Sequence, residues 1–270
     1  MTICVSVRIP EGLIMAADSV VTLEGTINTP QGTQHGVIQT FEFANKLVRI
    51  KDYPVGVMCW GLGSISNRSI ASLIMEWEHS YPVLEENKSF TVNNIAVALQ
   101  QFIAERYTKA FPSTGTNPPP VLGLFIGGYS SGQFFSEQFQ ILFPGKISIV
   151  RPNKQDGSLD FGANWFGQID ALNRLIHGYD NTAIAELVKR GADKAIVQKW
   201  IDDHISELPL IFDGMPIQDA VDFANYAVQL TIGRFRFAAG VPVCGGNVDI
   251  AVITPTTFRW AQRKQWSIKE

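Results

Sequence analysis

The chain has 270 residues, enough for one large domain or two smaller ones with a substantial core. Hydrophobic residues make up 46% and charged residues 17%, which is typical of a globular protein and excludes a disordered chain. The formal net charge is −3 and no basic run is present, so we expect no nucleic-acid partner.

Cysteine usage and the N-terminal segment indicate the compartment. Cys4, Cys59 and Cys244 are an odd, widely spaced set, which argues against a disulfide framework and suits a reducing environment. The N-terminus lacks the basic and apolar regions of a signal peptide, and no apolar stretch is long enough to cross a bilayer. We therefore expect a cytoplasmic protein with no membrane partner.

The first nineteen residues predict a β-hairpin. Polar and apolar residues alternate from Thr2 to Ile9, a three-residue turn signal follows, and an unbroken apolar run leads to Asp18. If all three turn residues form the loop, Ile9 pairs with Leu13 and Cys4 lies opposite Asp18. Thr2 is then on the same face and diagonal to the acid, at about 7–8 Å between Cα atoms. We therefore expect Thr2 and Asp18 to share a site.

The remaining elements follow from hydrophobic periodicity and turn signals. Residues 22–37 are rich in Thr, Gly, Gln and Pro and are interpreted as an extended loop or ragged hairpin. In chain order, we then predict strands at 41–51 and 55–60, helices at 66–81 and 92–111, a proline-rich loop at 112–120, strands at 121–129, 134–143 and 159–165, helices at 168–177, 182–190, 193–204 and 216–232, and strands at 248–254 and 258–268.

This order of elements indicates the fold class. Hairpin-linked strands and helices come in separate blocks, which is typical of mainly antiparallel sheets with helices segregated to the outside. Two sheets packed face to face, with a helix layer on each outer face, would bury the apolar faces of all these elements. We therefore predict an α+β, four-layer αββα sandwich that forms one domain over residues 1–270.

Thr2 is the first candidate for chemistry. A threonine is small enough for the preceding Met1 to be removed. An N-terminal threonine then carries both the nucleophilic hydroxyl and a base, its α-amine with a pKa of about 8. The alternative is that threonine simply suits a strand, as in many chains that begin Met-Thr.

Lys46 and the turn that starts at Gly61 are the next candidates. Lys46 interrupts an otherwise apolar strand, and a buried lysine needs an acid partner, for which Asp18 is the obvious choice. A cation beside the Thr2 hydroxyl would favour its alkoxide; the alternative is a solvent-facing lysine on an edge strand. Gly61 and Gly63 would let a backbone N–H approach a reacting carbonyl, as an oxyanion site requires. An ordinary strand-to-helix turn is the alternative there.

Other chemistries have no support in the sequence. The four histidines lack metal-ligand spacing, and no cysteine pair has zinc spacing. No Walker-type phosphate loop and no Gly-x-Ser-x-Gly motif is present. We therefore expect no metal and no cofactor.

Taken together, these features resemble a proteasome β subunit, a member of the N-terminal-nucleophile hydrolases, and more narrowly a divergent bacterial proteasome-related member. The resemblance is carried by Thr2 at the start of the first strand, residues 12–19 and 45–47, the glycine turn at 61–64, and the glycine turn and strand at 245–253. It implies the N-terminal-nucleophile hydrolase fold. It also implies Thr2 as nucleophile after loss of Met1, Asp18 and Lys46 as its activating pair, and the Gly61 N–H as oxyanion donor.

The same resemblance implies a threonine-type endopeptidase that hydrolyses peptides or unfolded proteins. Such an enzyme works inside a self-compartmentalising homo-oligomer, usually a ring, and an ATP-dependent unfoldase is a further expected type of partner. Val21, Met58 and Cys59 are candidates for lining an apolar specificity pocket. Two alternatives stay open: an amidase of the same mechanism acting on small amides, and a non-catalytic ring subunit.

The chain departs from the pattern of the family at two places. The turn at 165–168 lacks the serine that the family commonly has beside the threonine amine. Around Val241 and Cys244, the second acid and serine of the family are replaced. These departures concern the surroundings of the amine and leave Thr2, Asp18 and Lys46 in place.

Overall fold

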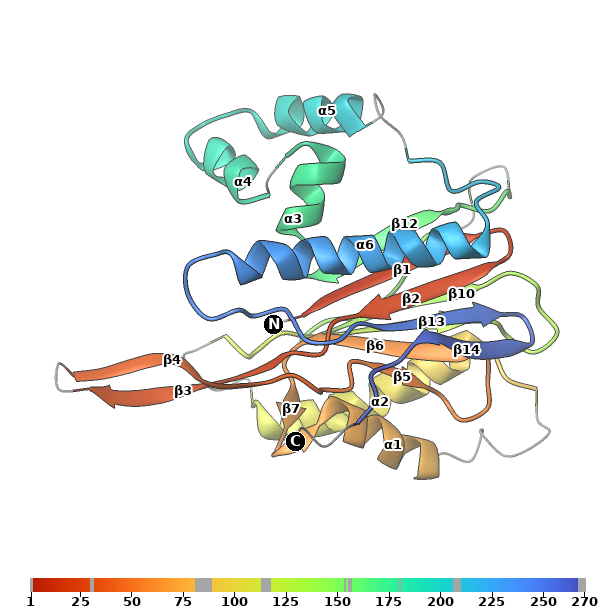
Figure 1. The fold of residues 1–270 in the computed structure, drawn as a ribbon, viewed down its shortest axis with the longest axis horizontal. Coiled ribbons are helices and arrows are strands. Elements are labelled where there is room, and N and C mark those ends of the chain that lie inside the picture. The colour runs from red at the N-terminus through yellow and green to blue at the C-terminus, as the bar shows by residue number, and fades with distance from the viewer. Residues whose placement is uncertain are drawn as a thin grey trace.

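The structure is a computed structural model that describes residues 2–29, 32–80, 89–112, 118–152, 154, 157–179, 181–205 and 210–266. Two five-stranded sheets pack face to face, with helices on both outer sides (Figure 1). This arrangement confirms the predicted α+β sandwich with its four layers.

The first sheet has the strand order β12-β1-β2-β13-β14, and all neighbouring pairs in it are antiparallel. Its strands are β1 (Ile3–Ile9), β2 (Gly12–Ala17), β12 (Gly162–Gly167), β13 (Asp249–Thr254) and β14 (Thr257–Gln262). One face of this sheet packs on the helix α6 (Ile217–Arg236), and the other faces the second sheet.

The second sheet has the strand order β11-β10-β9-β6-β5 and is also antiparallel throughout. Its strands are β5 (Leu47–Arg49), β6 (Val55–Gly61), β9 (Leu122–Gly128), β10 (Glu137–Phe143) and β11 (Ile147–Ile149). Two helices, α1 (Ile70–Ser80) and α2 (Val92–Ala110), cover its outer face. The side chain of Thr91 accepts a hydrogen bond from the Asn94 N–H and caps α2.

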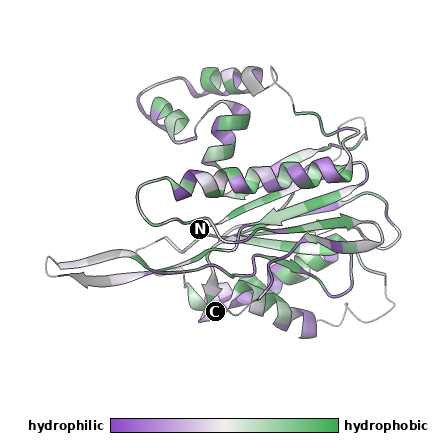
Figure 2. Ribbon diagram, in the orientation of Figure 1, coloured by the Kyte–Doolittle hydropathy of each residue, from purple (hydrophilic) through white to green (hydrophobic). Residues whose placement is uncertain are grey.

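Three apolar clusters lie between the four layers. One joins α1 and α2 to the second sheet, one lies between the sheets, and one joins the first sheet to α6. Buried alanines at 220, 224 and 227 form the inner face of α6 and let this helix approach β1 and β2. In Figure 2 the strands of both sheets are largely green, whereas purple is concentrated on the helices and loops.

The first third of the chain holds one confirmed and one wrong prediction. Residues 22–37 were expected to form an extended loop or a ragged hairpin, and the hairpin is present: β3 (Val21–Thr29) and β4 (Gly32–Phe41) form a two-stranded ribbon, with a register shift between Leu23 and Glu24, that projects from the body (Figure 1). The strand expected at 41–51 is interrupted after Phe41, and the chain resumes as β5 only at Leu47. A second short ribbon, β7 (Ser64–Ile65) with β8 (Arg68–Ser69), precedes α1.

The helices expected between 168 and 204 are present with changed bounds. The first is a short α3 (Asp170–Leu172) that continues as the π-helix η2 (Asn173–His177). It is followed by α4 (Asn181–Lys189) and α5 (Lys194–Ile205), which stand above α6 in Figure 1. None of the helices in the described ranges is long and apolar enough to span a membrane.

Candidate active site

The register of the N-terminal hairpin differs by one residue from the prediction. Ile9 pairs with Gly12 rather than with Leu13, so the loop has two residues, and Cys4 pairs with Ala17. Gly12 belongs to the strand because β13 lies close on its other side: a Cβ on Gly12 would stand 3.0 Å from the Ile253 O. The close packing of two strands, and not a turn, thus explains the glycine at this position.

This register still places Asp18 beside the start of β1. The Asp18 N–H donates to the Ile3 O at 3.3 Å, and its Oδ1 accepts from the Ile3 N–H at 3.1 Å. Thr2 directly precedes β1 and is itself buried, at 5% exposure. Asp18 therefore contacts the residue next to Thr2, whereas the same-face, diagonal position expected for Thr2 was derived from a register that the structure does not have.

Lys46 and Asp18 form a buried ion pair. The Lys46 Nζ lies 2.8 Å from the Asp18 Oδ1, and the two side chains are 6% and 0% exposed. Lys46 lies in the loop just before β5 and not within a strand, contrary to the prediction, but it is not solvent-facing. On the other carboxylate oxygen, Oδ2 accepts from the Gly245 N–H at 3.0 Å. The acid is thus held by a lysine and by two distant main-chain segments.

Burial raises the pKa of the Asp18 carboxyl above its ordinary value, because the charged form loses its hydration. The charge and hydrogen bond of Lys46 oppose this shift, as do the N–H groups of Gly245 and Ile3. The protonation of Asp18 is therefore sensitive to whatever displaces Lys46.

The turn after β12 holds the main chain of Thr2. The Gln168 N–H donates to the Thr2 O at 2.8 Å. Gly167 has a φ of +89° and lies so close that a Cβ on it would stand 2.0 Å from the Thr2 O. The turn that lacks the serine of the resembled family thus contacts Thr2 through its backbone. Met1, whose removal is expected, lies outside the described residues.

Gly61 ends β6 with a φ of +80°. A Cβ on this glycine would stand 2.3 Å from the Val121 O, so its close approach to the strand entering β9 requires glycine. The following Leu62 N–H donates to the same carbonyl oxygen at 2.8 Å. This packing explains the glycine by itself, and the role of Gly61 as oxyanion donor stays a prediction.

The three cysteines are buried, and their thiols are not activated as nucleophiles. Burial raises the pKa of the Cys59 thiol to about 11 and that of Cys244 to about 12, and it raises that of Cys4 as well. All three thiols are therefore neutral at physiological pH. Cys59 and Met58 were expected to line a specificity pocket, but both are buried in the apolar clusters. Within the described ranges, no group of His, Cys, Asp and Glu is arranged to hold a metal ion.

Sequence reasoning missed Ser19 as a junction between three segments. The Ser19 Oγ donates to the Glu42 O at 2.6 Å, and its N–H donates to the Gly245 O at 3.1 Å. Its own carbonyl accepts from the Ala44 N–H at 2.9 Å. These bonds fix the base of the β3–β4 ribbon next to both Asp18 and Lys46. A serine directly after a buried acid carries no sequence signal for such a role.

A second buried ion pair, Asp249 with Lys264, was also missed. Both side chains are nearly fully buried, and the Lys264 N–H donates to the Asp249 Oδ1 at 2.9 Å. Asp249 pairs in register with Ala17, next to Asp18. An acid at the end of an apolar strand had pointed to Asp18, and an acid at the start of one could have identified Asp249 in the same way.

Comparison with known proteins supports the fold and corrects the family. A solved structure of an Anbu protein, the Gly-1 mutant from Hyphomicrobium sp. strain MC1, is similar to this chain with a TM-score of 0.55 and 16% identity. The match covers 100% of this chain and 89% of that one, and at this identity it shows the fold alone. No family model and no curated protein matches the chain. The assignment to the proteasome β-subunit family was therefore wrong, and what is supported is a fold similar to that of Anbu.

Proposed function

We propose that this chain hydrolyses amide bonds with Thr2 as an N-terminal nucleophile, after removal of Met1. The observation that carries the proposal is the buried Lys46–Asp18 pair beside the first strand. A buried ion pair loses the hydration of both charges, and apolar residues of similar volume would often stabilise a core as well or better. An ion pair in such a place therefore favours a chemical role over a packing role.

In the proposed reaction, the Thr2 Oγ1 attacks the carbonyl carbon of the substrate and its proton passes to the α-amine. The tetrahedral intermediate then collapses, the C–N bond breaks, and the amine proton goes to the leaving nitrogen, which leaves an ester on Thr2. Water hydrolyses the ester by the same sequence of proton transfers. Lys46 stabilises the alkoxide, Asp18 holds Lys46, and the Gly61 N–H binds the oxyanion.

The substrate class that we propose is a peptide bond in a peptide or an unfolded protein. The first test is intact-mass measurement before and after incubation with a peptide epoxyketone, which reacts with a hydroxyl and an adjacent amine. We expect a chain without Met1 that gains one adduct, mapped to Thr2. Thr2→Ala should remain unlabelled, whereas Thr22→Ala, a control in β3, should be labelled like the wild type.

Retained methionine, or an adduct that persists in Thr2→Ala, would contradict the nucleophile. Turnover of fluorogenic peptides and of small acyl amides should be compared in the same preparation. Cleavage of the peptides supports the proposed peptidase, while turnover of small amides alone would assign the chain to the small-amide alternative.

Activity and stability are expected to respond to pH in opposite directions. Asp18 must be ionised to hold Lys46, so kcat/KM should fall as the pH is lowered. The midpoint of this fall should lie above pH 3.8, because burial raises the pKa of the Asp18 carboxyl above that ordinary value. The pKa of Asp18 is higher in the folded chain than in the unfolded chain, so protonation of Asp18 stabilises the fold. This contribution to the free energy of unfolding is complete when the pH is below the pKa of the unfolded chain, and it is lost as the pH rises through the pKa of the folded chain.

Denaturant unfolding and steady-state kinetics across this pH window measure both effects. Asp18→Asn should remove the decline in stability, and Asp52→Asn, at an exposed carboxyl, should leave both profiles unchanged. A stability profile that Asp18→Asn does not alter would contradict this assignment.

We further propose that identical copies assemble through the β3–β4 ribbon. An isolated two-stranded ribbon is marginal in water, and this one carries exposed Leu23, Ile38 and Phe41. Native mass spectrometry should show a species larger than one chain, and Ile38→Glu should shift it toward the single chain. A single chain at micromolar concentration in the wild type would contradict the proposal.

A further inference from the structure

A cavity of about 480 Å³ lies between the α3–η2 helix and the C-terminal end of α6. Its volume is within the range of small-molecule sites, about 300–1,000 Å³. The residues that define its character are Gln168, Arg174, Leu175, Leu230, Arg234 and Phe235. None of them belongs to the Asp18–Lys46 pair, and the reaction proposed for Thr2 does not use them.

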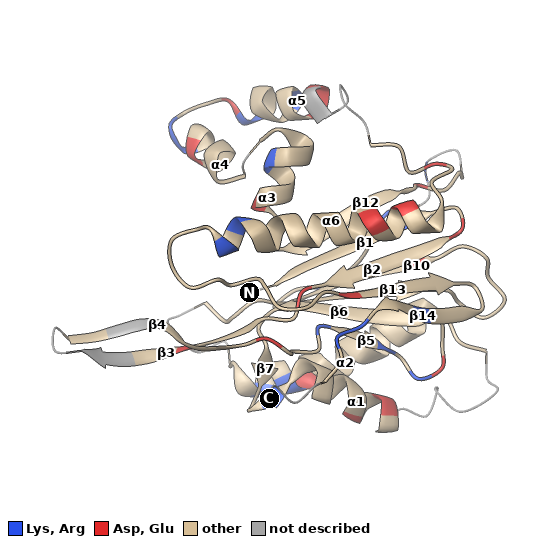
Figure 3. Cartoon of the chain, viewed as in Figure 1, with Lys and Arg blue, Asp and Glu red and all other residues tan. Residues whose placement is uncertain are grey.

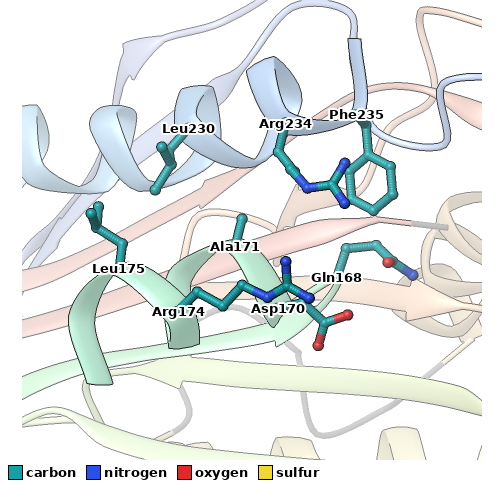
Figure 4. A pocket seen from close by; sticks show the side chains of 8 residues that line it. All are labelled: Gln168, Asp170, Ala171, Arg174, Leu175, Leu230, Arg234 and Phe235. Atoms are coloured by element: carbon teal, nitrogen blue, oxygen red, sulfur yellow. The ribbon is translucent and has the colours of Figure 1, made fainter. Parts of the chain in front are cut away.

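The lining divides into a polar and an apolar part. Figure 4 shows Arg174, with the Asp170 carboxylate next to it, Arg234, with the Phe235 ring next to it, and Gln168 toward one end of the cavity. Leu175 and Leu230 lie together at the other end. The two arginines come from different elements, since Arg174 lies in η2 and Arg234 in the last turn of α6. In Figure 3 blue marks the α3–η2 helix and the last turn of α6.

The charges of the lining favour an anion. Two arginines and one aspartate, Asp170, give the cavity a net positive charge. Guanidinium groups bind carboxylates through paired, charge-assisted hydrogen bonds, and they bind them more strongly than neutral amides. The leucines and the Phe235 ring offer apolar contact to whatever the anionic group carries.

We propose that this cavity binds a carboxylate borne by a compact apolar group. The C-terminal residue of a peptide and a short fatty acid both have this chemistry. The wall of the cavity is joined to Thr2, because the Gln168 N–H donates to the Thr2 O at 2.8 Å. A ligand in the cavity therefore contacts the turn that fixes the main chain of Thr2, whether or not Thr2 is a nucleophile.

Isothermal titration calorimetry tests the proposal with four probes on the wild type and on Thr2→Ala, in which no hydrolysis occurs. N-acetylleucine and octanoate represent the two sources, and N-acetylleucinamide and octanamide are the uncharged controls. We expect each carboxylate to bind at least about tenfold more tightly than its amide, since one charge-assisted hydrogen bond is worth about that factor. The stronger of the two carboxylates identifies the source.

Three variants assign the binding to this cavity. Arg234→Gln and Leu175→Glu, both at exposed positions, should weaken carboxylate binding about tenfold by removing a cation or adding an anion. Arg190→Gln, an exposed arginine of the α4 region that pairs with Glu186, should leave the affinity unchanged. Equal binding of acid and amide, no binding at millimolar concentration, or an affinity that Arg234→Gln does not change would each overturn the proposal.

Discussion

Lys46→Met is expected to lower the free energy of unfolding by about 3–5 kcal/mol and to abolish turnover. The substitution leaves the Asp18 carboxylate buried, with only the N–H groups of Ile3 and Gly245 as partners. An uncompensated buried charge, rather than the lost contact itself, is the main source of this cost. Denaturant unfolding followed by circular dichroism measures the first effect, and peptide turnover measures the second.

The double variant Asp18→Asn with Lys46→Met separates the structural role from the chemical one. Replacing both charges removes the uncompensated carboxylate, so most of the stability should return. Turnover should stay absent, because the cation to which the proposed mechanism assigns stabilisation of the Thr2 alkoxide is removed. Arg190→Gln is the control for an exposed ion pair and should cost less than about 1 kcal/mol. Recovery of turnover in the double variant would contradict the role of Lys46.

Gly167→Ala is expected to reduce turnover about 100-fold while the chain stays folded. The added Cβ would stand 2.0 Å from the Thr2 O, so the main chain of Thr2 must move. A displacement of about 1 Å at a reacting group can cost a factor of about 100 in rate. The positive φ of +89° adds strain of about 1–3 kcal/mol for a residue with a side chain.

Gly132→Ala is the matched control for the strain alone. Gly132 also has a positive φ, of +73°, but a Cβ there meets nothing within 4 Å. This variant should show a similar loss of stability and normal kinetics. If both alanine variants retain full turnover, the contact between Gly167 and Thr2 does not position the nucleophile.

The sequence by itself determined the layers of this protein and its most informative contact. Periodicity separated strands from helices because each element buries only one face, which leaves a local pattern in the residue order. The pairing of Asp18 with Lys46 was likewise foreseeable. Each is a charge in an apolar stretch, and buried charges need partners of opposite sign.

Only the tertiary structure decided the details that position these residues. The hairpin register was misjudged because Gly12 lies in a strand closely packed against β13, which is far along the chain, and not in the loop next to it. The contacts of Gly245 with Asp18 and of Gln168 with Thr2 join distant segments in the same way. Backbone N–H groups are the same in every residue except proline, so the sequence carries no mark of which of them will meet a given oxygen.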